Sequence, residues 1–198
     1  MGRRSHHHHP RPLSPTDESL TMPPKIKPHE YAVKLMLSWK GKTEDPPNSN
    51  NFPPLQNAVA RIVKDGVKVP RWQTHGGFAW CVWACFVAYA DGGSRAAIRE
   101  IENSNAAWTV QVLKDATNKI NGLRIMQKPR RGDLVLFDLP AGQNVDHAGL
   151  LLAYTKDAVT CIEGNTSSGS LGNQANGGGC YIRTRPRSNV RAFVRIGA

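Results

Sequence analysis

The sequence predicts an α+β fold in which N-terminal helices pack on a C-terminal antiparallel sheet. The first part of the chain carries apolar residues at helical spacing, whereas after Pro129 the pattern changes to short strands separated by turns. Helices first and strands second are typical of an α+β domain. With 198 residues, of which 39% are hydrophobic, the chain can bury one sizeable core. We therefore expect one domain over residues 29–198, preceded by an arm.

Residues 1–28 form the predicted arm, which is rich in proline and lacks apolar periodicity. We expect this arm to be disordered or to link the domain to another segment. It contains a run of histidines from His6 to His9. A solvated tail or an expression tag explains this run better than a metal site, because adjacent imidazoles without a scaffold bind metal without any function.

Five segments in the first part of the chain are predicted to be helical. Residues from Val82 to Ala90 are almost wholly apolar, which indicates a buried helix. The last predicted helix offers the core Trp108, Val110, Val112, Leu113 and Ile120. The predicted helices span residues 30–39, 55–64, 82–90, 95–102 and 106–120.

The predicted strands follow one another closely enough to form an antiparallel sheet. A long loop rich in Gly, Ser and Asn is expected between Thr166 and Gly179, near the end of the strand that carries Glu163. The expected strands span residues 133–139, 147–154, 158–163, 180–184 and 190–196.

Charge and cysteine content limit the classes of function. The net charge of +11 predicts attraction to polyanions such as nucleic acids, anionic membranes or cell-wall phosphates. Basic clusters at residues 128–131 and 183–191 are not interleaved with aromatic residues, so no specific nucleic-acid partner is expected. None of the four cysteines forms a CxxC pair, and reduced thiols are expected. Cys161 and Cys180 both lie in predicted strands, and the sequence does not decide whether they form a disulfide.

The chain also shows no membrane or export signal. No apolar run approaches the roughly 20 residues that cross a bilayer, so no membrane span is expected. The N-terminus lacks the apolar stretch of a signal peptide. We therefore expect synthesis in the cytoplasm without an export address.

Cys81 is the strongest candidate nucleophile in the sequence. It follows a Gly-Gly turn and opens the apolar helix, where unpaired N–H groups and the positive end of the helix dipole favour a thiolate. The same N–H groups suit an oxyanion hole. Cys85 lies one turn further in, where burial disfavours its thiolate. Taken alone, however, a cysteine in an apolar helix is more often a core residue.

Possible partners for this cysteine lie in the predicted sheet. His147 opens a strand after a loop, so its imidazole is expected to project from a sheet edge rather than from the core. Glu163 ends the next strand, where its carboxylate can orient His147, and Asn165 can serve the same purpose or donate to an oxyanion. Asp133 is expected to be a structural turn residue, and Asp146 to point to the face opposite His147.

Four short segments together resemble a known family. They are Trp80-Cys81, residues 129–137 (PRRGDLVLF), residues 146–150 (DHAGL) and residues 162–166 (IEGNT), and the loop of residues 44–51 is also similar. This set resembles the CHAP-type cysteine amidohydrolases, which belong with the papain-like, NlpC-related peptidoglycan hydrolases of phage endolysins. The resemblance covers about residues 29–198.

The resemblance implies a papain-like α+β fold and a role for each matched residue. Cys81 would be the nucleophile, His147 the base, Glu163 the orienting acid and Asn165 a supporting polar residue. Asn50 in the upstream loop would contact substrate. Two alternatives stand for Trp80, which either packs in the core or forms a wall of the substrate groove.

One departure from the family pattern concerns the helix register. The family usually has Phe three residues after the cysteine, whereas this chain has Ala84 there and Phe86 two residues later. A register set by Phe86 would place Trp83, which cannot act as a nucleophile, in the catalytic position. Trp80 before Cys81 favours the first register, and Cys85 remains an alternative nucleophile.

The expected function is hydrolysis of an amide bond in bacterial peptidoglycan, without a metal or an organic cofactor. Both an endopeptidase and an N-acetylmuramoyl-L-alanine amidase would use the same residues. We expect a monomer that acts at the bacterial cell wall. Two other classes compete with this function: a non-catalytic phage tail or wall-binding module of the same fold, and a basic nucleic-acid-binding protein.

Overall fold

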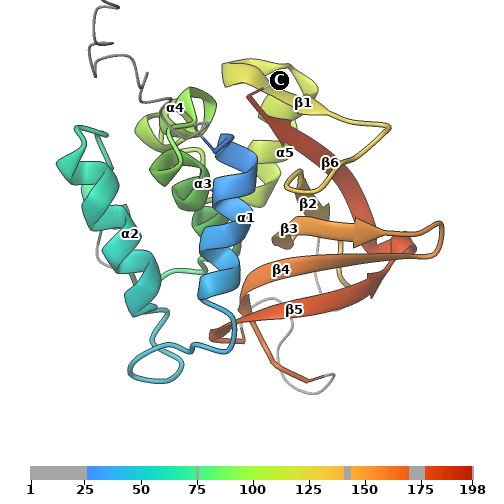
Figure 1. Ribbon diagram of the computed structural model, residues 1–198, viewed down its shortest axis with the longest axis horizontal. Helices are drawn as coiled ribbons and strands as arrows, with labels where there is room; N and C mark the ends of the chain where they lie inside the picture. The colour runs from blue at the N-terminus through green and yellow to red at the C-terminus, as the bar shows by residue number, and fades with distance from the viewer. Residues whose placement is uncertain (1–25, 75, 141–143, 170–176, 198) are drawn as a thin grey trace, which may run out of the picture.

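Helices pack against a six-stranded antiparallel sheet in the computed structural model, which describes residues 26–74, 76–140, 144–169 and 177–197 (Figure 1). The predicted α+β class is therefore confirmed. Residues 1–25 of the predicted arm, which include the histidine run, lie outside the described residues. Pro28, which the sequence assigned to the arm, instead begins the first helix.

Local sequence signals explain where several helices begin. Pro28 and Pro53 each occupy a first helical position, where proline loses no hydrogen bond and its fixed φ suits the helix. Ser94 caps another helix, since its hydroxyl oxygen accepts a hydrogen bond from the Ala97 N–H. The helices are α1 (Pro28–Ser38), α2 (Pro53–Lys64), α3 (Cys81–Asp91), α4 (Arg95–Glu102) and α5 (Thr109–Thr117).

Helix α3 is the centre of the helical layer. Every residue from Cys81 to Ala90 is buried, as the apolar sequence predicts. Helices α1, α2 and α4 pack against α3, which in turn contacts strands β3 and β4 of the sheet (Figure 1). Because its whole circumference is covered, α3 holds its N-terminus in a fixed position relative to the sheet. None of the helices in the described part of the chain has the length and apolar character that crossing a bilayer requires.

Helix α5 corrects the expectation for residues 106–120. It begins only at Thr109, and Trp108 and Val110, which were expected in the core, are 60% and 58% exposed. Ile120 is also exposed, because Lys119 adopts a positive φ of 58° and ends the helical path before it. Only Val112 of the expected set is fully buried, since α5 turns a single face to the core.

The sheet has the strand order β1-β6-β2-β3-β4-β5, with antiparallel pairing throughout. Strand β1 was not predicted because it has three residues, of which only Leu123 is buried. Strand β4 continues past Glu163 to Thr166, where a shift in register accommodates Asn165 with a φ of 57°. The strands are β1 (Leu123–Ile125), β2 (Leu134–Phe137), β3 (His147–Tyr154), β4 (Ala158–Thr166), β5 (Gly179–Pro186) and β6 (Val190–Ile196).

Both faces of the sheet carry buried side chains. One face contributes Leu134, Leu150 and other residues to the main core beneath the helices. The opposite face holds a smaller cluster that includes Phe137 and Cys161. Cys161 belongs to this second cluster and Cys180 to the main core, so these two thiols lie on different faces, and all four cysteines are free.

Gly164 permits close packing between β4 and the residue before α3. A Cβ atom at this position would lie 2.5 Å from Cζ3 of the Trp80 ring. This ring cannot move aside easily, because it is 1% exposed and stacks on Phe52 with 4.4 Å between ring centroids. The glycine therefore lets the sheet approach the start of α3.

We expect Gly164→Ala to lower the free energy of unfolding by about 1–3 kcal/mol, because an added methyl group overpacks a rigid contact. Denaturant unfolding monitored by fluorescence measures this change. Gly179→Ala is the matched control, since its Cβ would meet only the far end of the partly exposed Tyr181 side chain, which can rotate away. Equal destabilisation in both variants would contradict this account of Gly164.

Candidate active site

Cys81 is the first residue of α3 and follows the turn at Gly76 and Gly77, which have φ angles of 69° and 83°. The first hydrogen bond of the helix runs from the Ala84 N–H to the Trp80 carbonyl, at 2.9 Å. The N–H groups of Cys81 and the next two residues therefore precede the helical ladder. They provide donors and a positive dipole end beside the sulfur.

The Cys81 side chain borders a cavity, whereas Cys85 does not. A cavity of about 200 Å³ is lined by Cys81 together with residues that precede α3 and α5. Cys85 lies fully buried one turn further along, with its Sγ 3.4 Å from the Cys81 carbonyl. Burial raises the pKa of the Cys85 thiol well above its usual value. Access and electrostatics therefore favour Cys81 over Cys85 as the nucleophile.

A buried carboxylate fixes the segment that leads into α3. Glu44 accepts hydrogen bonds from the Trp80 indole N–H at 2.8 Å and from the Asn50 backbone N–H at 3.1 Å. Of the two alternatives for Trp80, the structure shows core packing. Sequence reasoning gave Glu44 no role, although its place in the loop that resembles the family was a signal.

Asn50 holds the loop against the turn before Cys81. Its carbonyl accepts a hydrogen bond from the Gly77 N–H at 3.2 Å, and a Cβ atom on Gly76 would lie 3.0 Å from the same oxygen. Its side-chain Oδ1 is buried and has no hydrogen-bond partner among the described residues. The backbone of Asn50 thus positions the Gly-Gly turn, and substrate contact by its side chain stays a prediction.

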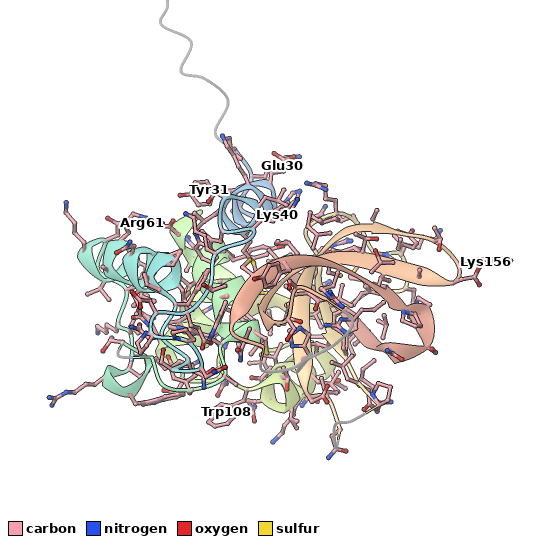
Figure 2. The ribbon with its side chains drawn as sticks, turned by 90° about the horizontal axis from the view of Figure 1, so that it is seen from below. Glu30, Tyr31, Lys40, Arg61, Trp108 and Lys156 are labelled. Carbon is pink, nitrogen blue, oxygen red and sulfur yellow. The ribbon has the colours of Figure 1, made fainter. Side chains whose placement is uncertain are left out.

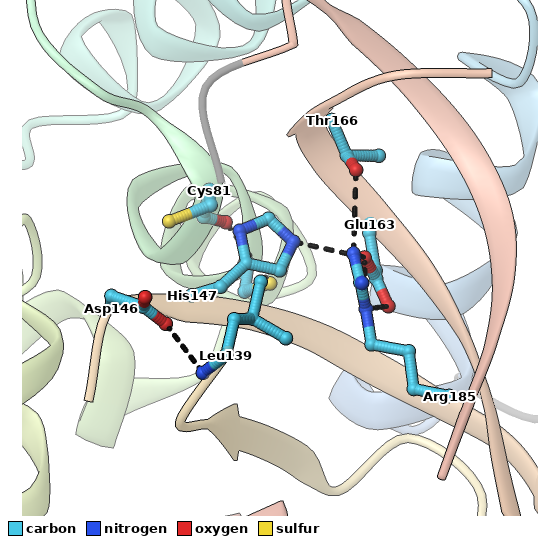
Figure 3. Close-up of polar contacts among 8 residues, drawn as sticks. Cys81, Leu139, Asp146, His147, Glu163, Thr166 and Arg185 are labelled. Atoms are coloured by element: carbon cyan, nitrogen blue, oxygen red, sulfur yellow. Dashed lines mark hydrogen bonds and ion pairs between the residues drawn. The ribbon is translucent and has the colours of Figure 1, made fainter. Parts of the chain in front are cut away.

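His147 and Glu163 form a buried pair beside Cys81 (Figure 3). The His147 Nε2 atom lies 2.9 Å from the Glu163 Oε2 atom, and both side chains are 0% exposed. The expectation that His147 projects from a sheet edge is wrong, because β3 is an interior strand flanked by β2 and β4. The imidazole is instead enclosed, with the Phe137 ring stacked beside it at 6.1 Å.

Gly149 leaves the space through which the two side chains meet. It is the direct partner of Glu163 in the β3–β4 ladder. Residues that face each other across a ladder project to the same side of the sheet, and so do His147 and Gly149, which are two positions apart. A Cβ atom on Gly149 would lie 2.6 Å from the Glu163 Cγ. The glycine therefore allows Glu163 to reach His147.

Arg185 completes the buried charge arrangement from strand β5. Its Nε donates to the Glu163 Oε1 at 2.9 Å and its Nη2 to Oε2 at 2.5 Å (Figure 3). The guanidinium also lies 5.4 Å from the centroid of the Phe137 ring. Sequence reasoning noted the basic cluster that contains Arg185 but assigned it no contact, because its partner is 22 residues away along the chain.

These contacts shift the pKa values of both members of the pair. Burial raises the pKa of Glu163, but the hydrogen bonds and positive charges of His147 and Arg185 outweigh burial and lower it below its usual value. Burial lowers the pKa of His147, but the Cys81 side chain and Glu163 outweigh burial and raise it to about 9. At neutral pH, His147 is therefore protonated and Glu163 is ionised.

The second imidazole nitrogen faces the cysteine. Nδ1 of His147 lies on the Cys81 side of the ring, opposite the nitrogen that contacts Glu163 (Figure 3). It has no hydrogen-bond partner among the residues that the structure describes. Glu163 thus occupies one nitrogen and leaves the other for proton exchange with the thiol.

The remaining candidates do not bond to this pair. Both side-chain polar atoms of Asn165 are buried without a hydrogen-bond partner in the described part of the chain, so its supporting role stays a prediction. Asp146 accepts a hydrogen bond from the Leu139 N–H at 3.2 Å and lines the cavity beside Cys81. Asp133 pairs with Arg195 and accepts the Arg130 N–H, as expected for a structural residue.

The arrangement contains the elements of nucleophilic catalysis: a thiol at a helix N-terminus, an imidazole beside it and a carboxylate that orients the imidazole. Within the described ranges, no group of three or more His, Cys, Asp or Glu residues could hold a metal ion. Comparisons with protein-family models, with curated proteins and with solved structures returned no match. The functional inference therefore depends on the geometry of Cys81, His147 and Glu163 and on the sequence motifs that carry them.

The raised pKa of His147 predicts a pH-dependent stability. Its protonation stabilises the folded state fully below pH 6.5, and this contribution is lost as the pH rises through about 9. At about 1.4 kcal/mol per pKa unit, we expect a decrease in the free energy of unfolding of as much as about 3 kcal/mol. Urea unfolding of the wild type and of His147→Gln over pH 6 to 10 measures it, and parallel pH profiles for the two proteins would contradict the assignment.

Proposed function

We propose that this protein is a CHAP-type cysteine amidohydrolase of papain-like fold that cleaves an amide bond in bacterial peptidoglycan. The observation that carries this proposal is the alignment of Cys81, His147 and Glu163, with one imidazole nitrogen 2.9 Å from the carboxylate and the other on the thiol side. A protein that only packs or binds would have no need of a carboxylate that orients a histidine beside a cysteine at a helix N-terminus.

The attack step uses the fraction of His147 that is neutral. This imidazole takes the proton of the Cys81 thiol, and the resulting imidazolium stabilises the negative charge on sulfur. The sulfur attacks the amide carbonyl carbon, and the carbonyl oxygen becomes an oxyanion. The N–H groups at the start of α3, which precede the helical ladder, can donate to this oxyanion. Glu163, held by Arg185, keeps the imidazole in the orientation that proton exchange requires.

The later steps return the enzyme to its starting state. As the tetrahedral intermediate collapses, His147 gives its proton to the leaving amine, the C–N bond breaks and a thioester remains on Cys81. Neutral His147 then removes a proton from water, which attacks the thioester and releases a carboxylic acid. A His147 pKa of about 9 favours the protonated form that the leaving amine requires.

The proposed substrate follows from the sequence motifs and the charge. The four segments that resemble the CHAP-type family include all three residues of the site. A net charge of +11 would concentrate the enzyme on an anionic cell wall, an effect that weakens with salt. The proposal is an endolysin-like enzyme, synthesised in the cytoplasm of a bacterial host and active at its wall as a monomer. The amide bond that it cleaves would lie in the stem peptide, in the cross-bridge or at the junction between the stem peptide and the glycan.

We expect Cys81→Ala to abolish hydrolysis of purified peptidoglycan, lowering the rate by at least about a thousandfold, because no other group can form the thioester. Loss of turbidity and release of amino groups measure the rate. The matched control is Cys85→Ala, which removes a neighbouring thiol that does not border the cavity and should retain activity. Retained activity in Cys81→Ala, or no hydrolysis by the wild type, would contradict the proposal.

The same preparations distinguish the competing functions. A wall-binding module would sediment with peptidoglycan and release no amino groups. A nucleic-acid-binding protein would bind DNA in a salt-dependent manner and would be indifferent to blockade of its thiols. Neither alternative explains why His147 and Glu163 are buried together beside Cys81.

A further inference from the structure

Three aromatic side chains, two of them exposed and one half-buried, form a cluster beside the cavity of Cys81. They are Trp72, Phe78 and Trp108, referred to below as the aromatic platform. The Trp72 ring lies 5.2 Å from Phe78 and 6.2 Å from Trp108, measured between centroids. Trp72 is 44% exposed and Trp108 is 60% exposed. Figure 2 shows the Trp108 side chain at the edge of the molecule, directed away from the ribbon.

The platform and the nucleophile share one cavity. Phe78 and Trp108 line the space of about 200 Å³ that Cys81 also borders. Phe78 precedes α3 and Trp108 precedes α5, so two segments far apart in the sequence bring their rings to the same place. A group seated on these rings would lie next to the sulfur of Cys81.

The platform is better explained by a ligand than by packing. Two adjacent tryptophans with exposed rings present apolar surface to water, whereas soluble proteins usually cover such surface or use it for binding. Trp80 and Trp83 show the alternative, since both are fully buried in the core of this chain. The exposed pair therefore marks a contact surface beside the candidate active site.

The polar lining of the cavity indicates a neutral ligand. Asp146 and Thr109 lie beside the rings, and no lysine or arginine is among the described residues that line the cavity. Asp146 directs Oδ1 to the Leu139 N–H. Its carboxylate can also accept hydrogen bonds from hydroxyl or amide groups, but it repels anions. An anionic ligand such as a wall phosphate or a free carboxylate therefore does not fit here, despite the basic charge of the whole chain.

A sugar ring matches this combination of surfaces. One face of a pyranose presents C–H groups that pack on flat aromatic rings, while its hydroxyl and acetamido groups point sideways to hydrogen-bond partners. A volume of about 200 Å³ is smaller than that of a typical drug-sized pocket and suits a single ring.

We propose that the aromatic platform, together with Asp146, binds a neutral N-acetylated hexosamine ring of the glycan strand. This inference rests on the proposed function and specifies its substrate. With the sugar on the platform, the carbonyl that reaches Cys81 is the one that joins the sugar's acyl side chain to the first residue of the stem peptide. Hydrolysis of that bond transfers the acyl group from the amine to sulfur and then to water, and it leaves a carboxylate that Asp146 repels.

Binding of a glycan without a peptide tests the site separately from catalysis. The probe is the trisaccharide of N-acetylglucosamine, titrated into Cys81→Ala protein while tryptophan fluorescence is followed. We expect saturable binding that weakens by about tenfold in Trp108→Ala and in Trp72→Ala, because loss of one stacking contact costs about 1.4 kcal/mol. Tyr154→Ala is the matched control, since Tyr154 is 50% exposed at the far end of β3 and should not alter binding.

Two further variants and one product analysis complete the test. Trp108→Phe should restore most of the affinity that Trp108→Ala loses, which a folding defect would not permit. Absence of saturable binding, or equal affinity in both alanine variants and the control, would overturn the inference even if the enzyme hydrolyses peptidoglycan. New amino termini on the first residue of the stem peptide would support the inference. Termini found only within the peptide would overturn it and leave the hydrolase function intact.

Discussion

The buried carboxylate of Glu163 is the constraint on which the rest of the candidate site depends. An ionised carboxylate without water is costly unless it is paired and hydrogen-bonded. Here Arg185 supplies three hydrogen bonds and His147 a fourth, so the negative charge is compensated on two sides. Removing either partner would take hydrogen bonds from the buried carboxylate and leave one cation to pair with it. The same pairing that makes burial tolerable also directs the imidazole toward Cys81, so stability and the proposed chemistry depend on one set of contacts.

A second set of contacts places the helix that carries the thiol. Glu44 bonds to the Trp80 indole, which lies against Gly164 in the strand of Glu163. The residue before the nucleophile and the carboxylate behind the histidine are therefore joined through one tightly packed contact. Gly149 acts similarly on the other strand, where the absence of a side chain admits Glu163. Two glycines and two buried carboxylates thus fix the relative positions of α3, β3 and β4.

Much of this arrangement was predictable from short sequence signals. An apolar helix after a Gly-Gly turn located Cys81, and the starts and ends of strands located His147 and Glu163. The burial of His147 was not predictable, because strand order decides whether a strand lies at an edge, and a single sequence does not contain that order. The same limit explains why Arg185 was missed, since its contact depends on the pairing of β4 with β5.

The exposed tryptophans illustrate a different limit. Apolar character predicted Trp108 in the core, but local breaks on both sides of α5 turn it toward solvent. From its apolar character alone a tryptophan is expected in the core, and that character does not distinguish a core tryptophan from one that binds a ligand. Its exposure became informative only when the structure placed it beside Cys81 and Phe78.

The most direct test of the central claim, that His147 and Glu163 activate Cys81, is the selectivity of thiol alkylation. Brief treatment of the folded protein with iodoacetamide at neutral pH, followed by peptide mapping, measures the reactivity of each cysteine. We expect Cys81 to react at least about tenfold faster than Cys85, Cys161 and Cys180, and His147→Gln to slow the reaction of Cys81. Preferential reaction of another cysteine, or an unchanged Cys81 rate in His147→Gln, would contradict it.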